Sequence, residues 1–295
     1  MTAQEFEARI AAWARSQSEV EALIQIGSRA DPKGRVDAWS DWDFYLISRR
    51  PERFMRDDWL QRIAPPWCAH AERTPRGVTK LSVVFAGGFE ADFVLLKAWQ
   101  MKLVFWCMRR PGLARFMPAR LQRGIMETRA FLLASGTRVL VGGSAWERRL
   151  TALGTAWPDT IFTAEDFSRN AEAFWQKAVW IAKRIARPEL RAAMHWLHQL
   201  ATDHVYVLLA EEARLAGRPA RAEARKAEQW LDARRLEQTA IGTGPDQRVL
   251  GQALLAEIAL FEEVSRSVAA SRGFALPDHS AVAAWLRAEL AKFPR

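Results

Sequence analysis

The sequence predicts an α+β chain of two domains, in which a mixed α/β domain is followed by an all-helical bundle. The chain has 295 residues, more than a single core usually serves, and 49% of them are hydrophobic, which is enough to fill two cores. Up to about residue 150, short apolar stretches alternate with other patterns, whereas from Ala164 onward the periodicity is helical. We therefore expect domains at 1–150 and 151–295.

The expected elements of the first domain are a helix at about 4–17 and five short apolar strands, each bounded by Gly, Pro or charge. These strands are expected at 22–26, 43–48, 80–86, 91–96 and 138–143. The second domain is expected to contain helices at about 165–187, 189–216, 220–238, 247–271 and 280–292, separated by Pro- and Gly-containing breaks. The Ala-, Arg- and Glu-rich segment 220–238 has the composition of a solvated helix with i, i+4 ion pairs.

The chain has the features of a soluble, cytoplasmic protein. No apolar run approaches the roughly 20 residues that a membrane-spanning helix needs. The first residues form an amphipathic helical pattern and do not resemble a signal peptide. The two cysteines, Cys68 and Cys107, lack metal-type spacing, and we expect them to be reduced.

Positive charge is concentrated in the first domain. Residues 1–150 contain 24 Lys and Arg against 16 Asp and Glu, a net charge of +8, whereas residues 151–295 contain 19 against 18. No acid occurs between Asp92 and Glu127, but seven cations do: Lys97, Lys102, Arg109, Arg110, Arg115, Arg120 and Arg123. Such a field attracts a nucleotide or a nucleic acid backbone, although a solvated basic face is equally compatible with it.

Two aspartates one residue apart begin the second apolar strand. Asp41 and Asp43 are expected to project from the same face of that strand. Two carboxylates this close repel each other unless a cation lies between them. Mg²⁺ is the simplest such cation, and it prefers carboxylates together with phosphate oxygens. Pairing with nearby Arg or Lys side chains is the alternative for this pair taken alone.

The surroundings of this pair favour a nucleotide site. Gly27 and Ser28 follow the preceding strand, where a glycine allows close approach of the backbone and the next residue can offer its amide and hydroxyl to phosphate. A later strand carries Glu90 and Asp92 on one face, and Asp92 is placed to complete a group of three carboxylates.

These motifs carry a family resemblance. The pattern "GSRA…SDWDF…ADFVLL" resembles the nucleotidyltransferase superfamily related to DNA polymerase β, and more closely the aminoglycoside 6-adenylyltransferases, also called streptomycin adenylyltransferases. The stretches 173–193 and 260–278 are similar to helices of that family, so the resemblance covers nearly the whole chain. It implies an N-terminal nucleotidyltransferase domain and a helical substrate-binding domain, with ATP and the acceptor bound between them.

The resemblance also implies roles for individual residues. Nucleotide-binding residues would be Gly27, Ser28, Arg29 and Lys183. Mg²⁺ would be bound by Asp41, Asp43 and Asp92, which are also the catalytic residues. Asp92 is the first choice for the base that takes the proton of the attacking hydroxyl, with Glu90 and Glu189 in reserve. Glu90, Glu189 and Trp42 are the expected substrate contacts, and Trp39 is a second tryptophan beside the aspartates.

The predicted function is transfer of AMP from ATP to a hydroxyl of an aminoglycoside-type antibiotic such as streptomycin, which would give resistance. Two features leave the acceptor open. A polycationic acceptor prefers an acidic pocket, whereas this chain has a formal net charge of +9. An expected acidic motif is replaced by Gly142 and Gly143. The alternatives are a nucleotidyltransferase that modifies RNA or protein, which the basic first domain favours, and a non-catalytic nucleotide-binding module.

Overall fold

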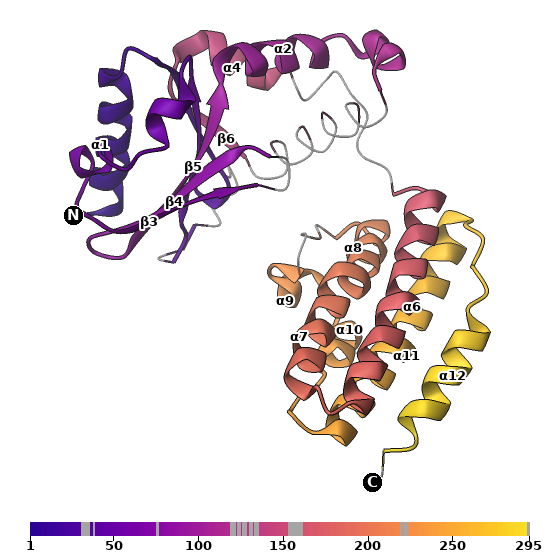
Figure 1. Cartoon of the computed structure of the whole chain (residues 1–295). Helices are drawn as coiled ribbons and strands as arrows, with labels where there is room; N and C mark the ends of the chain where they lie inside the picture. Colours follow the sequence, from indigo (N-terminus) through magenta and orange to yellow (C-terminus); the bar gives the residue numbers. More distant parts are fainter. Residues whose placement is uncertain are drawn as a thin grey trace. The chain divides into compact units, whose positions relative to one another are not determined.

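The computed structural model divides into two compact units, Met1–Thr160 and Ile161–Arg295 (Figure 1). It describes residues 1–30, 36–37, 39–74, 77–118, 122, 125, 129, 132, 136–152, 162–218, 220 and 224–293. The first unit contains a six-stranded mixed sheet and the second is built from helices. The predicted fold class is therefore confirmed.

The sheet of the N-terminal unit has the strand order β3-β4-β5-β2-β1-β6. The strands are β1 (Val20–Ile26), β2 (Trp42–Ser48), β3 (Pro66–Arg73), β4 (Thr79–Phe85), β5 (Phe89–Lys97) and β6 (Thr137–Val141). Neighbouring strands are antiparallel except β2 and β5, which run parallel. Five of these strands were predicted. The edge strand β3 was not, because nearly all its residues are exposed and the alternating apolar pattern of a half-buried strand is missing.

Each face of the sheet has its own hydrophobic core. On one face, helix α1 (Ala3–Ser16) packs Phe6, Ile10 and Trp13 against apolar side chains of the strands. On the other face, α2 (Ala98–Met108) and α4 (Gly143–Thr151) belong to a core with Ala22, Ile24 and Ile26 of β1. Short 3₁₀ turns at Ser28–Ala30, Pro51–Phe54, Leu60–Arg62 and Pro111–Phe116 connect these elements. The alternation within β2 follows from the two cores, because Trp42 and Phe44 point into the first and Asp43 points away from it.

The C-terminal unit is a bundle around two long helices (Figure 1). Its helices are α6 (Ala164–Ala186), α7 (Leu190–Leu200), α8 (Tyr206–Leu215), α9 (Ala227–Trp230), α10 (Ala233–Thr239), α11 (Gln247–Arg272) and α12 (Ser280–Leu290). A π-helical turn at Ala201–Val205 joins α7 to α8. Phe174 of α6 stacks on Phe261 of α11 with ring centroids 3.7 Å apart, so these two helices share the centre of the core. No described helix is both long and apolar enough to cross a membrane.

The prediction of one solvated helix at 220–238 is wrong for the described residues. The segment contains two short helices, α9 and α10, separated at Leu231, which is extended. Asp232 starts α10 by accepting a hydrogen bond from the backbone N–H of Arg235 (2.8 Å), so it interrupts the helix instead of continuing it.

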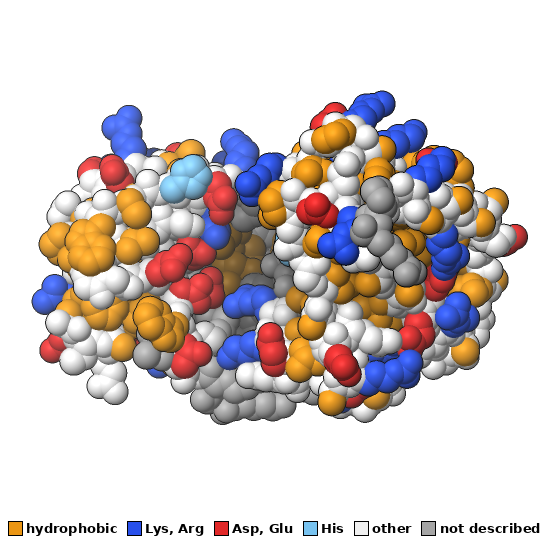
Figure 2. Space-filling view, turned by 90° about the horizontal axis from the view of Figure 1, so that it is seen from below, with side chains coloured by type: hydrophobic (Ala, Val, Ile, Leu, Met, Phe, Trp, Pro, Cys, Tyr) orange, Lys and Arg blue, Asp and Glu red, His pale blue; other side chains and the backbone are white. Residues whose placement is uncertain are grey.

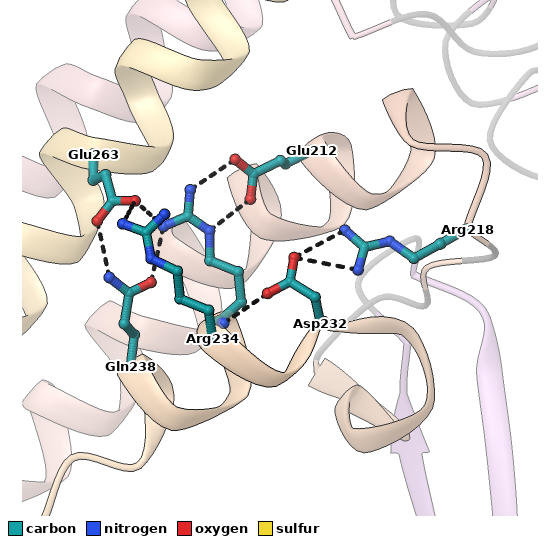
Figure 3. A network of polar contacts seen from close by, with 7 residues as sticks. Glu212, Arg218, Asp232, Arg234, Gln238 and Glu263 are labelled. Carbon is teal, nitrogen blue, oxygen red and sulfur yellow. Dashed lines mark hydrogen bonds and ion pairs between the residues drawn. The ribbon is translucent and has the colours of Figure 1, made fainter.

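A network of hydrogen bonds and ion pairs links this segment to α8 and α11 (Figure 3). Arg235 is 6% exposed, and its guanidinium donates two hydrogen bonds to the carboxylate of Glu212 on α8, both of 2.8 Å. It also donates to Glu263 Oε1 on α11 (2.6 Å) and to Gln238 Oε1 (2.9 Å). Burial acts to lower the pKa of Arg235, but the carboxylates of Glu212 and Glu263 outweigh burial and raise that pKa above its usual value. The arginine therefore ties α10 to two other helices.

Candidate active site

Two aspartates lie side by side on neighbouring strands of the sheet. Asp43 of β2 is the register partner of Asp92 of β5, and both are partly exposed. Register partners on neighbouring strands project from the same face, so the carboxylates share the face opposite Trp42 and Phe44. A single face of the sheet therefore carries two acids within reach of one bound group.

The turn after β1 passes close to this pair at Gly27. Gly27 has a φ of +80°, which favours glycine, and a Cβ at this position would lie 2.5 Å from Asp43 Oδ2. No real Cβ lies that close to an oxygen, so a side chain here would displace the carboxylate. The sequence predicts that this glycine admits a ligand, and that stays a prediction. The structure shows that the absence of a side chain at Gly27 leaves room for the Asp43 carboxylate.

Arg29 positions the chain that leads into β2. Its Nε and Nη2 donate to the carbonyl oxygen of Ser40 (3.0 and 2.6 Å), and Nε also donates to the carbonyl oxygen of Asp41 (3.1 Å). The guanidinium carbon lies 3.5 Å from the centroid of the Trp42 ring. Burial lowers the pKa of Arg29, and nearby carboxylates of Glu7 and Asp41 oppose that effect. Arg29 therefore holds the backbone at Ser40 and Asp41, and its predicted contact with the nucleotide stays a prediction.

Trp42 packs in the core of the N-terminal unit. The residue is 4% exposed, and its ring lies edge-on to Phe6 at a centroid distance of 4.9 Å. Because its ring is buried, Trp42 packs β2 against the core of the unit. It is therefore not one of the substrate contacts expected from the sequence. Its neighbour Trp39 is 95% exposed and remains available for stacking on a ligand.

Asp92 has a cationic partner that the sequence pattern did not predict. Lys80 of β4 lies with Nζ 2.8 Å from Asp92 Oδ2 and 3.2 Å from Glu72 Oε1 of β3. Ser82 is the register partner of Asp92, and Lys80 is two residues earlier on the same face of β4. Burial acts to lower the pKa of Lys80, but its hydrogen bonds to Asp92 and Glu72 outweigh burial and raise that pKa above 10.5.

The donor set fits a hard divalent cation in its chemistry. Asp43 and Asp92 offer carboxylate oxygens, and Asp92 Oδ1 is buried without a hydrogen-bond partner. The described residues contain no group of three or more His, Cys, Asp or Glu arranged to hold a metal ion. Asp41 lies just before β2, two residues from Asp43, so the structure pairs two of the three predicted acids and leaves Asp41 at the entry to the strand.

The other predicted residues of this unit lie around the pair. Ser28 opens the 3₁₀ turn after Gly27 and is partly exposed. Glu90 is exposed on β5, two residues before Asp92, so the prediction that these acids share one face is confirmed. Asp37 and Ser40 stabilise the turn that carries Trp39, because the Asp37 carboxylate accepts from the Trp39 N–H and the Ser40 hydroxyl, each at 3.0 Å.

Lys183 and Glu189 belong to the helical unit. Lys183 is exposed in the last turn of α6. Glu189 stands at the start of α7, as expected from Pro188, and its carboxylate pairs with Arg184 of α6. The guanidinium of Arg184 also lies 4.4 Å from the centroid of the Trp180 ring, so Glu189 is part of a local cluster between the two helices.

In a comparison with known families, residues 1–105 match the family described as streptomycin adenylyltransferase. These residues contain β1, β2 and β5 with Gly27, Asp43 and Asp92. The match confirms the resemblance drawn from the motifs, and with it the prediction of a nucleotidyltransferase. A search of curated proteins gives no match.

Two solved structures were compared along nearly the whole chain. An aminoglycoside 6-adenyltransferase from Bacillus subtilis is 13% identical, with a TM-score of 0.43, and the alignment covers 98% of this chain and 99% of that one. A nucleotidyltransferase-like protein from Exiguobacterium sibiricum is 11% identical, with a TM-score of 0.36, covering 98% of this chain and 88% of that one.

Proposed function

We propose that the protein transfers AMP from ATP to a hydroxyl of an aminoglycoside-type acceptor such as streptomycin, with Mg²⁺ as cofactor, and so confers resistance. The observation that carries this proposal is the pairing of Asp43 with Asp92 beside Gly27, within the residues that match the streptomycin adenylyltransferase family. Mg²⁺ is commonly bound through one or two carboxylates together with substrate phosphates, and a turn of backbone N–H groups can hold those phosphates.

The proposed role of each residue follows from its position. Asp43 and Asp92, with Asp41 two residues before Asp43, would hold Mg²⁺. When bound, the ion would neutralise charge on the phosphate oxygens. Gly27 and Ser28 would present backbone N–H groups and a hydroxyl to the triphosphate. Lys183 of α6 is the proposed cation of the helical unit for the same phosphates, because it is exposed.

In the proposed reaction, the acceptor hydroxyl attacks the α-phosphorus in line, and the bond to pyrophosphate breaks. The hydroxyl proton passes to a carboxylate within hydrogen-bond reach. Asp92 is the proposed base, because its Oδ1 has no hydrogen-bond partner. Glu90 on the same face and Glu189 are the proposed contacts to amino or guanidino groups of the acceptor, since carboxylates pair with cations.

The test is formation of the adenylylated product from streptomycin, ATP and Mg²⁺, followed by mass spectrometry. Asp43→Asn removes one negative charge without changing side-chain size, and we expect it to abolish product formation. Asp58→Asn, at an exposed position, is the matched control and should retain wild-type turnover. Full turnover of Asp43→Asn would remove this carboxylate from the site.

A nucleic acid acceptor is the second candidate, favoured by the exposed cations after α2. Arg109 and Arg110 are exposed, and the Arg110 guanidinium lies 4.1 Å from the centroid of the Trp106 ring, which is 47% exposed. Aromatic rings beside arginines can stack with bases. On the face shown in Figure 2, however, Lys and Arg side chains are dispersed among acidic and apolar ones. Binding that falls steeply with salt, and with neutralisation of both arginines, would favour this acceptor.

A further inference from the structure

The active-site carboxylates have a counter-ion from the protein itself. Lys80 Nζ lies 2.8 Å from Asp92 Oδ2, which is hydrogen-bond distance for a charged pair. The lysine side chain is 26% exposed and that of Asp92 is 15% exposed, so the pair is shielded from much of the solvent screening that weakens surface ion pairs. Asp43 is the register neighbour of Asp92 on the other side of β5 from Lys80, so the ammonium contacts one member of the carboxylate pair directly.

The position of Lys80 is determined by three neighbouring strands. Register places Lys80 opposite Glu72 of β3, and its Nζ is 3.2 Å from Glu72 Oε1. Glu72 and Asp92 therefore hold the ammonium from both sides of β4. Because it has two carboxylate partners, Lys80 has a defined position on this face of the sheet when no ligand is bound.

We propose that Lys80 is a built-in counter-ion of the carboxylate pair, which competes with a divalent cation for Asp92 when no nucleotide is bound. This inference rests on the proposed function. The ammonium contacts Asp92 Oδ2, and the metal ion would use the same carboxylate; a nearby positive charge lowers the affinity of a carboxylate site for another cation. The protein alone should bind divalent ions weakly, and the triphosphate of the nucleotide should supply the additional charge that brings the ion in.

Lys80 also stabilises the sheet before any ligand arrives. Asp43 and Asp92 are like charges on adjacent strands, and like charges opposite one another destabilise a sheet. Removal of the ammonium should therefore lower the melting temperature in the absence of divalent ions. Addition of the ion should restore the lost stability, because the ion takes over the same role.

The experiment measures Mn²⁺ binding to the full chain without nucleotide, by electron paramagnetic resonance of the free ion, together with melting temperature at increasing Mn²⁺. We compare wild type with Lys80→Met. The matched control is Lys102→Met, which removes another lysine paired with a glutamate, Glu21, in the same unit. We expect Lys80→Met to bind Mn²⁺ about tenfold more tightly than wild type does. Without Mn²⁺ the variant should have a lower melting temperature than wild type, and addition of Mn²⁺ should restore the melting temperature. Lys102→Met should bind as wild type does.

Unchanged or weaker Mn²⁺ binding in Lys80→Met would overturn the inference. Its failure is distinguishable from that of the proposed function by including ATP. If wild type binds Mn²⁺ with ATP and Asp43→Asn does not, while Lys80→Met changes nothing, only the role of Lys80 is refuted. If Asp43→Asn binds Mn²⁺ with ATP as wild type does, the carboxylate pair is not the metal site, and both proposals fail.

Discussion

A buried glutamate in the helical unit should make the stability of that unit fall as pH rises. Glu257 of α11 is 4% exposed, and its Oε2 has no hydrogen-bond partner. Burial raises the pKa of Glu257 from 4.5 to about 8, because the charged form loses its hydration. The folded protein therefore keeps this proton at neutral pH, whereas the unfolded chain releases it above pH 4.5.

The sign and size of the effect follow from this difference in pKa. Below pH 4.5 both states are protonated and the carboxyl group adds no pH dependence; between pH 4.5 and about 8 the unfolded state binds fewer protons, so stability is progressively lost. At 1.36 kcal/mol for each pKa unit, the free energy of unfolding falls by about 5 kcal/mol over this range. About 4 kcal/mol of this loss lies between pH 5 and pH 8.

The perturbation is Glu257→Met, which keeps the approximate volume and removes the titrating group. We expect the variant to be more stable than wild type at both pH values, because an unsatisfied buried polar group is also removed. Its advantage should grow by about 4 kcal/mol from pH 5 to pH 8. Scanning calorimetry of the full chain gives this difference, and hydrogen exchange of peptides from α11 assigns it to the helical unit. Glu228→Met, at an exposed position, is the control. An equal advantage at both pH values would refute the reasoning.

Two further substitutions test the packing around the site and the bundle. Gly27→Ala should reduce turnover at least about tenfold, because its Cβ would lie 2.5 Å from Asp43 Oδ2. The control is Gly88→Ala, at a φ of +76° and with open space around the position, which has the same backbone strain of about 1 kcal/mol without the clash. Equal turnover of the two variants would show that the clash is relieved elsewhere. Arg235→Met should lower the free energy of unfolding by about 2–4 kcal/mol in urea titration, because two carboxylates lose a buried partner. Arg234→Met, with a 70% exposed side chain, should cost less than about 1 kcal/mol, and a similar loss for both would contradict the assigned role of burial.

The sequence predicted the parts of the site that depend on local pattern. Gly27, Asp43 and Asp92 were identified because a glycine after a strand and acids within apolar strands stand out from their surroundings. Their register was not predictable, since it depends on how β2 and β5 pair across the 40 residues that separate the two strands. Lys80 was missed for the same reason. It becomes visible only when Ser82 is known to oppose Asp92.

Burial explains the remaining differences between sequence and structure. Trp42 beside the aspartates suggested a stacking platform, but strand alternation turns its ring into the core. Arg235 in an Ala- and Glu-rich segment suggested a solvated helix, yet Glu212 and Glu263, which are distant in sequence, provide two carboxylates that permit its burial. Composition and periodicity do not report such partners, because both are local properties of the chain.

The most direct test of the account is pyrophosphate release from ATP and Mg²⁺ across a panel of aminoglycosides, lincosamides and bulk tRNA. The Asp43→Asn/Asp92→Asn double variant, which neutralises the paired carboxylates, serves as the blank. We expect release of pyrophosphate with streptomycin or a related aminoglycoside, and none from the double variant. Release with tRNA and with no antibiotic would contradict the proposed acceptor, and release from the double variant would contradict the assignment of the site itself.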